Sequence, residues 1–290
     1  MPTFPPQMQD LSEYTESVNW CIFGDTGGGK TALAGQIPNS VIFAAERGTV
    51  SAARMHKNVK GRKVWPIAHW NDFVEGFEWI EANPGVMPWA AIDSATKAQA
   101  RAMRAIMEII VDRADAKAGG EGKGNRDVDL PDRPEHQKWQ NMFKRYVDDF
   151  TELPINVLWT AQAMRREDEN ANDLLLPYIY GKDFEISSYF CAQMDIVSYL
   201  DIIKQPRYKV RRLFFEKDPP IWAKDRYGVF GHHIDIAVDE GKGWRQLVTM
   251  PEMIAMIDNV PPQQRRRGGR GDNLPAPTRP TRARRTRKAT

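Results

Sequence analysis

The chain has 290 residues, of which 41% are apolar, and a formal net charge of +3. This length and composition are enough for one large domain with a buried core. Its two cysteines, Cys21 and Cys191, exclude a disulfide framework and a cysteine-rich metal site. No apolar run reaches membrane-spanning length and the first residues do not form a signal peptide, so we expect no membrane partner and a cytoplasmic location.

Residues 1–16 predict a proline-containing lead-in to the folded domain, and a glycine-rich motif follows it. The motif satisfies G-x-x-x-x-G-K-[ST], the P-loop or Walker A pattern. The apolar residues 18–23 before it predict a buried strand and the residues after it predict a helix, a context that argues against a chance glycine-rich turn. The motif consists of Gly24, Asp25, Thr26, Gly27, Gly28, Gly29, Lys30 and Thr31.

A P-loop in this context predicts a binding site for ATP and Mg²⁺. Backbone N–H groups of the loop and of the helix that follows point toward phosphate oxygens. We expect Lys30 to reach the β- and γ-phosphates, and the Thr31 hydroxyl to be a ligand of Mg²⁺. All eight residues of the loop are therefore candidate nucleotide-binding residues.

Strands and helices alternate after the P-loop. Short apolar runs predict strands and apolar residues at helical spacing predict helices, the first of which has Asn71 as its expected N-cap. Polar stretches without such periodicity predict loops. The predicted strands cover residues 41–45, 64–67, 89–94 and 155–161, the helices 71–82, 96–116 and 135–153, and the loops 118–134 and 165–183.

Two further strands, 195–200 and 208–215, predict a hairpin around residues 205–207. The repeated alternation of strand and helix is typical of an α/β fold with a mostly parallel central sheet and helices on both faces. We expect the late hairpin to extend that sheet at one edge. The folded domain is thus predicted to cover residues 17–260.

Residues 261–290 differ sharply in charge from the rest of the chain. They contain ten lysines and arginines and one acid, which gives +9 and leaves −6 for the other 260 residues. Their Arg/Pro/Gly composition cannot form a core, so we predict a disordered basic tail. A flexible polycation favours binding to nucleic acid with little sequence preference. A solubilising or partner-docking tail is the alternative.

Two acids at predicted strand ends are candidates for the chemistry. Asp93 ends a strand and is the expected second anchor of Mg²⁺. Hydrolysis also needs a carboxylate that orients or deprotonates the attacking water, and Ser94, which follows Asp93, cannot supply it. Glu46 ends the strand after the P-loop helix, and strand ends at this edge converge on the nucleotide. The alternative for Glu46 is a surface ion pair with Arg47.

The order of these parts resembles RecA-type ATPase cores. It is most similar to the phage Sak-type group of RecA-like single-strand annealing proteins, also described as phage AAA-type P-loop nucleotide-binding proteins. The resemblance covers about residues 17 to 230. It is carried by the P-loop, Ala45-Glu46-Arg47-Gly48, Ile92-Asp93-Ser94, His136 to Trp139, Thr160-Ala161-Gln162, and Ala223-Lys224-Asp225-Arg226-Tyr227-Gly228.

The resemblance implies a role for each matching residue. Glu46 is implied as the catalytic carboxylate, Asp93 as the acid on the Mg²⁺ side, and Gln162 as the sensor of the γ-phosphate. Lys224 and Arg226 match a K-x-R-x-G element that reaches the nucleotide of a neighbouring subunit, which implies a homo-oligomer, either a ring or a filament. A cation supplied in this way stabilises charge on the transferred phosphoryl group. A solvated charged turn is the alternative.

RecA-like relatives bind single-stranded DNA through the loops that follow the Asp93 helix and the Gln162 strand. In this chain these loops carry Lys123 and Arg126, and Arg165, Arg166 and Lys182, together with several acids. Tyr178 and Tyr180 are candidate platforms for stacked bases or, equally, buried anchors of the second loop. The two histidines at 232–233 lack metal partners at convincing spacing.

The resemblance predicts ATP-linked annealing or recombination of single-stranded DNA by a phage-encoded protein, in the cytoplasm of the host. A single-strand-binding protein is a further candidate partner. Two other functions stay open. One is a replicative helicase or helicase-loader ATPase, and the other is a nucleotide-gated DNA-binding module that does not hydrolyse ATP.

Overall fold

The computed structural model describes residues 17–56, 58–120, 127, 131–167, 173–181 and 185–259. The predicted lead-in and basic tail lie outside these residues, as do Lys123, Arg126 and Lys182. Among the helices of the described part, none is long and apolar enough to cross a membrane.

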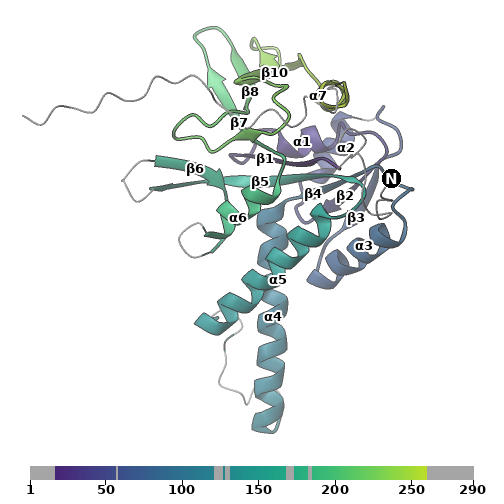
Figure 1. Ribbon diagram of the computed structural model, residues 1–290, viewed down its shortest axis with the longest axis vertical. Coiled ribbons are helices and arrows are strands. Elements are labelled where there is room, and N and C mark those ends of the chain that lie inside the picture. The colour runs from purple at the N-terminus through teal and green to yellow at the C-terminus, as the bar shows by residue number, and fades with distance from the viewer. Residues whose placement is uncertain are drawn as a thin grey trace, which may run out of the picture.

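One eleven-stranded sheet runs through the domain (Figure 1). Its main path has the order β11-β10-β8-β7-β1-β5-β4-β2-β3, while β6 pairs with β5 and β9 with β7. The strands are β1 (Asn19–Gly24), β2 (Ser40–Ala44), β3 (Lys63–Pro66), β4 (Trp89–Asp93), β5 (Asn156–Glu167), β6 (Asp173–Pro177), β7 (Ile196–Lys204), β8 (Lys209–Phe214), β9 (Lys224–Asp225), β10 (His233–Asp239) and β11 (Trp244–Gln246).

The strands from β3 to β7 in this order are all parallel to their neighbours, and β8, β10 and β11 continue the sheet with antiparallel pairing. The expected hairpin is present as β7 and β8, and it extends the sheet as predicted. The two outermost strands are short. β3 has four residues, among them Lys63 and Pro66, and β11 has three.

Helices cover both faces of the sheet, because alternate residues of each buried strand point to opposite sides. Cys21 and Phe23 pack in a core shared with α3, α4, α5 and α6, whereas Trp20 and Ile22 pack in a core shared with α1 and α7. The predicted α/β class is therefore confirmed. The helices are α1 (Lys30–Ala34), α2 (Thr49–Met55), α3 (Trp70–Ala82), α4 (Ala95–Ala118), α5 (Arg133–Thr151), α6 (Glu185–Gln193) and α7 (Met250–Asp258).

The start of α3 differs from the prediction. The helix begins at Trp70 with His69 as its N-cap, so the assignment of Asn71 was wrong. The Asp72 carboxylate accepts hydrogen bonds of 2.7 Å from the N–H groups of Ala68 and His69. An acid at this position satisfies free N–H groups of the first turn and fixes the helix start there.

The polar residues 165–173 were predicted as a loop, and this is wrong at both ends. β5 continues to Glu167 and β6 returns from Asp173, so that Arg165 lies opposite Leu175 in an antiparallel hairpin. Arg165, Arg166 and Glu167 are exposed. An alternating apolar pattern is a signal of half-buried strands, and this end of β5 lacks it because it is exposed.

Gly76 provides a test of the packing between α3 and the sheet. A Cβ at this position would lie 2.4 Å from Cε1 of the buried Phe43. Overpacking of this kind costs about 1–3 kcal/mol, more than the ~1 kcal/mol that alanine gains over glycine in a helix. We expect Gly76→Ala to lower the free energy of unfolding by about 1 kcal/mol in urea denaturation.

Gly85→Ala is the matched control, because no atom lies within 4 Å of the Cβ it would add. We expect it to leave the free energy of unfolding within about 0.5 kcal/mol of wild type. Equal stability of the two variants would contradict the packing described for α3.

Candidate functional site

The P-loop lies between the end of β1 and the start of α1, as its sequence predicts. Gly24 pairs with Leu200 of β7, and a Cβ on Gly24 would lie 2.3 Å from the Leu200 carbonyl oxygen. Gly29 has φ 113° and directly precedes α1. Only glycine accommodates both the close approach at residue 24 and the left-handed backbone at residue 29.

Lys30 lies within the loop, where its Nζ donates hydrogen bonds to the carbonyl oxygens of Gly24 (2.8 Å) and Asp25 (2.9 Å). Burial lowers the pKa of Lys30, although Glu46 and Asp93 act in the opposite direction. A buried ammonium group gains stability from anionic oxygens, so Lys30 is suited to contact phosphate.

Asp93 is buried (1% exposed) at the end of β4, surrounded by threonine hydroxyls. Its Oδ1 accepts hydrogen bonds from Thr160 (2.6 Å) and Thr31 (3.1 Å), and its Oδ2 from Thr49 (3.5 Å). Burial raises the pKa of this carboxyl despite the hydroxyl donors. The hydroxyl of Thr31 and the carboxylate of Asp93 are adjacent oxygen donors beside the P-loop, which is the ligand chemistry that Mg²⁺ prefers.

Glu46 lies next to Asp93, as expected from the convergence of strand ends. The N–H groups of Ala45 and Glu46 donate to the Asp93 carbonyl oxygen at 2.8 and 3.2 Å. The Ser94 hydroxyl donates a hydrogen bond to Glu46 Oε1. Two backbone contacts and one side-chain contact therefore hold Glu46 beside the residue expected to anchor the metal. Its catalytic role stays a prediction.

Gln162 also lies at this edge of the sheet, directly opposite Gly24 in the pairing of β1 with β5. Its backbone N–H donates to Thr96 Oγ1 at 3.2 Å, near the start of α4. The structure thus brings Gln162 next to the first residue of the P-loop. Its role as a sensor of the γ-phosphate stays a prediction.

Lys224 and Arg226 do not join the P-loop of their own chain. Lys224 pairs with Val197 near the start of β7, whereas Gly24 of the P-loop lies opposite Leu200, further along that strand. Arg226 Nη1 forms an ion pair of 2.9 Å with Asp195. Burial, followed by repulsion from Arg226, lowers the pKa of Lys224 to about 8. Their contact with the nucleotide of a neighbouring subunit stays a prediction.

A cavity of about 300 Å³ adjoins the P-loop and was not foreseen from the sequence. Gly29 and α1 line one side, and Arg211 of β8 and Trp244 of β11 line the other. The Arg211 guanidinium lies 4.1 Å from the centre of the Trp244 ring, and a Cβ on Gly29 would be 3.1 Å from Arg211 Cζ. Arg211 Nε is buried and has no hydrogen-bond partner among the described residues.

No local pattern marks Arg211 or Trp244 as residues of a site, because the register of β8, β10 and β11 brings them to α1. Arg211 lies opposite Ala237 of β10, next to an irregularity between Asp235 and Ala237. Such an irregularity re-aims side chains without leaving a clear sequence signal.

Comparison with known protein families shows which family the chain belongs to. A family model described as an AAA domain matches residues 16–227, and the chain therefore belongs to this family. Membership implies a P-loop domain that binds a nucleotide, typically together with Mg²⁺. The P-loop suits the phosphates of a nucleotide, and the oxygen donors of Thr31 and Asp93 suit Mg²⁺. Nothing matches among curated proteins. The chain is also similar to the solved structure of a KaiC-like protein, PH0186, from the hyperthermophilic archaeon Pyrococcus horikoshii OT3, with 14% identity, a TM-score of 0.36, and coverage of 71% of this chain and 81% of that chain.

The burial of the Asp93 carboxylate leads to a prediction about the stability of the fold. Its folded pKa is raised, so its contribution to stability falls as pH rises above about 4, the ordinary aspartate value. Asparagine keeps an acceptor for the Thr31 and Thr160 hydroxyls but carries no charge. We expect Asp93→Asn to raise the free energy of unfolding of the nucleotide-free protein by about 1 kcal/mol at pH 7, measured in urea.

This gain should shrink as pH falls below about 4, because the Asp93 carboxyl of wild type is then protonated in both the folded and the unfolded state. Asp72→Asn is a control of opposite sign, because backbone hydrogen bonds lower the pKa of Asp72 and its loss removes stability at pH 7. A lower stability of Asp93→Asn at pH 7 would show that the ionised carboxylate is not a cost to the fold.

Proposed function

Taking membership of the AAA domain family as the premise, we propose that this protein binds and hydrolyses ATP with Mg²⁺, binds single-stranded DNA, and promotes ATP-linked annealing or recombination of strands. The observation that carries the proposal is the contact of three groups at one edge of the sheet. Asp93 accepts a hydrogen bond from Thr31 of the P-loop, and Glu46 is held beside Asp93 through Ser94.

The phosphates of ATP occupy the P-loop in this proposal. Lys30 exchanges its contacts with the carbonyl oxygens of Gly24 and Asp25 for contacts with phosphate oxygens, a stronger type of hydrogen bond. Thr31 and Asp93 would hold the metal ion, and a metal ion there would supply charge neutralisation for the phosphates. The nucleoside enters the cavity between α1, Arg211 and Trp244, because that cavity begins at Gly29 of the P-loop.

Glu46 orients the attacking water and accepts a proton from it. The hydrogen bond from Ser94 fixes the carboxylate, so that little reorganisation is needed when water binds. Ser94 is thus a positioning residue. Asp93 is not available as the base in this proposal, because its Oδ1 accepts two hydroxyl hydrogen bonds and its Oδ2 accepts one from Thr49.

DNA binding is assigned to the hairpin of β5 and β6. This hairpin continues from the sheet edge that carries Gln162, and its exposed Arg165 and Arg166 supply cations of the kind that bind phosphates. Part of this charge is offset, since Arg165 pairs with Asp173 at 3.5 Å. Residues 261–290, which lie outside the described part of the chain, are a second candidate for binding DNA through their basic charge.

Replacement of Glu46 tests the hydrolytic mechanism. We expect Glu46→Gln to lower ATP turnover by about 10²- to 10⁴-fold, because the amide accepts no proton from water, while Mg-ATP affinity changes little. Steady-state turnover and equilibrium binding of a fluorescent ATP analogue measure the two effects. The control Glu81→Gln, an exposed residue of α3, should behave as wild type. Unchanged turnover in Glu46→Gln would remove Glu46 from the mechanism.

The role of Arg226 toward a neighbouring subunit has a separate test. We expect Arg226→Ala to lose turnover and to regain part of it when mixed with Lys30→Ala, because one mixed interface then combines an intact P-loop with an intact Arg226. Asp195→Asn is the control, since it breaks the same ion pair and leaves the cation. Equal loss of turnover in Asp195→Asn, with no recovery on mixing, would make Arg226 a residue of its own fold only.

The alternatives differ in what they do to DNA. Annealing of two complementary strands that depends on ATP supports the proposal. Directional unwinding of a duplex would instead indicate a helicase or helicase loader. ATP-dependent DNA binding without measurable turnover would indicate a nucleotide-gated binding module, in which the P-loop acts as a switch.

A further inference from the structure

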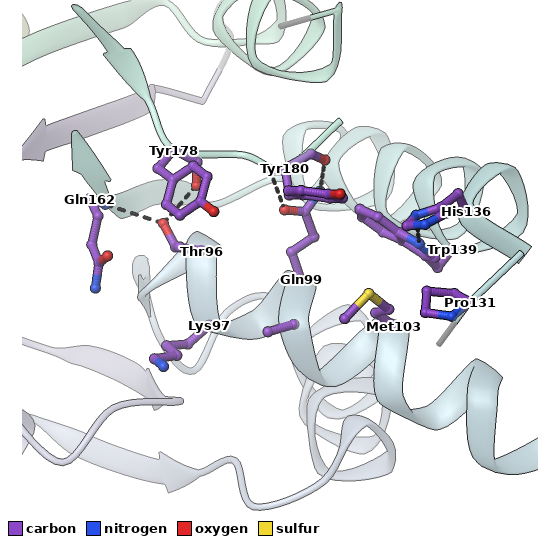
Figure 2. A pocket seen from close by; sticks show the side chains of 11 residues that line it. Thr96, Lys97, Gln99, Met103, Pro131, His136, Trp139, Gln162, Tyr178 and Tyr180 are labelled. Carbon is purple, nitrogen blue, oxygen red and sulfur yellow. Dashed lines mark hydrogen bonds between the residues drawn. The ribbon is translucent and has the colours of Figure 1, made fainter. Parts of the chain in front are cut away.

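A second cavity, of about 520 Å³, has Gln162 among its lining residues (Figure 2). The first half of α4, the start of α5 and the segment after β6 enclose it. Its volume falls within the range of small-molecule sites. Its lining includes Gln162 but neither Glu46 nor Asp93.

Aromatic rings form one wall of this cavity. The rings of Tyr180 and Trp139 are stacked, with centroids 5.7 Å apart and planes at 26°, and Figure 2 shows them side by side above α4. Trp139 is buried and its Nε1 donates to His136 Nδ1 at 3.3 Å. Tyr180 is 47% exposed as a residue, and Trp139 is stacked on one face of its ring.

Hydrogen bonds with Gln99 hold the backbone of Tyr180 in place. The buried side chain of Gln99 binds both backbone groups of Tyr180: Nε2 donates to the carbonyl oxygen (2.8 Å) and Oε1 accepts from the N–H (2.7 Å). A ring held in this way loses little conformational entropy when a flat ligand stacks on it. This arrangement settles the earlier alternatives for Tyr180 only in part, since its backbone is anchored and the residue is exposed.

The charge of the lining identifies the class of ligand. The residues that line the cavity include Lys97 and His136, and no residue of the lining is an acid. Lys97 is exposed near the start of α4, and its side chain points away from the Tyr180 ring in Figure 2. An aromatic wall beside a cation suits a planar, uncharged ring that is attached to an anion. A nucleobase with its phosphate has this chemistry, and base stacking on aromatic side chains is the main contact of proteins that bind single strands without sequence preference.

Hydrogen bonds connect this cavity with the nucleotide site. Gln162 N–H donates to Thr96 Oγ1 (3.2 Å), Thr96 Oγ1 donates to the Tyr178 carbonyl oxygen (2.8 Å), and Tyr178 N–H donates to the Gln162 carbonyl oxygen (2.6 Å). This closed ring of three residues lies directly beside Gly24 of the P-loop, because Gln162 pairs with Gly24. Any effect of one ligand on the affinity of the other must be reciprocal.

We infer that the cavity between Tyr180, Trp139 and α4 binds one unstacked base of single-stranded DNA, with the base on the Tyr180 ring and the adjoining phosphate on Lys97. The inference rests on the DNA binding proposed above and specifies where and how one nucleotide is held. Because the contact is to the face of the base, it carries little sequence preference.

The experiment uses the full chain and an oligothymidine that contains one 2-aminopurine, whose fluorescence falls on stacking. We expect wild type to bind the oligonucleotide and to quench the probe. Tyr180→Ala should weaken binding about tenfold and abolish the quenching, whereas Tyr180→Phe should retain both. Lys97→Gln should lower the slope of log affinity against log salt by about one.

Tyr208→Ala is the matched control, because Tyr208 is exposed to a similar extent (43%) in the turn between β7 and β8, away from the cavity. It should bind as wild type. If wild type binds DNA but Tyr180→Ala binds it equally and quenches equally, the cavity is not a base site and the proposed DNA function stands. If wild type binds no single-stranded DNA, both proposals fail, and an apolar side chain of a protein partner becomes the occupant to test.

Discussion

A carboxylate buried without a full counter-charge determines the architecture of this domain. Asp93 receives hydroxyl hydrogen bonds from α1, α2 and β5, and its backbone carbonyl receives two N–H groups from the end of β2. One residue of β4 thus joins four neighbouring elements. The hydroxyl groups only partly offset burial, since the pKa of Asp93 remains raised. Burial of the ionised carboxylate lowers the free energy of unfolding. A ligand that supplies a cation beside Asp93 would relieve this cost and stabilise the folded state.

The strand that ends in the P-loop lies between the strands that lead to the two cavities. Gly24 lies opposite Leu200 of β7 and Gln162 of β5. Along β7 the sheet continues to β8, where Arg211 lies opposite Ile202 and contributes to the cavity beside α1. Along β5 it continues to the segment that carries Tyr180. The two cavities therefore lie toward opposite sides of β1 in the strand order, one lined by Arg211 of β8 and the other by Gln162 of β5.

The sequence predicted those features whose signals are local. The P-loop, the buried strands and the β7–β8 hairpin follow from short patterns, and the proximity of Glu46 to Asp93 follows from the rule that parallel strand ends converge. Features that depend on long-range register were not predictable. Arg211 and Trp244 are distant in sequence and meet only through antiparallel pairing. The exposed end of β5 lacks an apolar pattern, and the contact of Arg226 with Asp195 joins segments that no motif relates.

The outer strands limit how copies of this protein can associate. At one border β3 offers only four residues, with Lys63 at its start and Pro66, which has no N–H, at its end. At the other border β11 offers three residues. Short borders with a charge or a proline discourage continuation of a sheet from one molecule into the next. If copies of this protein associate head to tail, we expect side-chain surfaces rather than paired outer strands to form the contact.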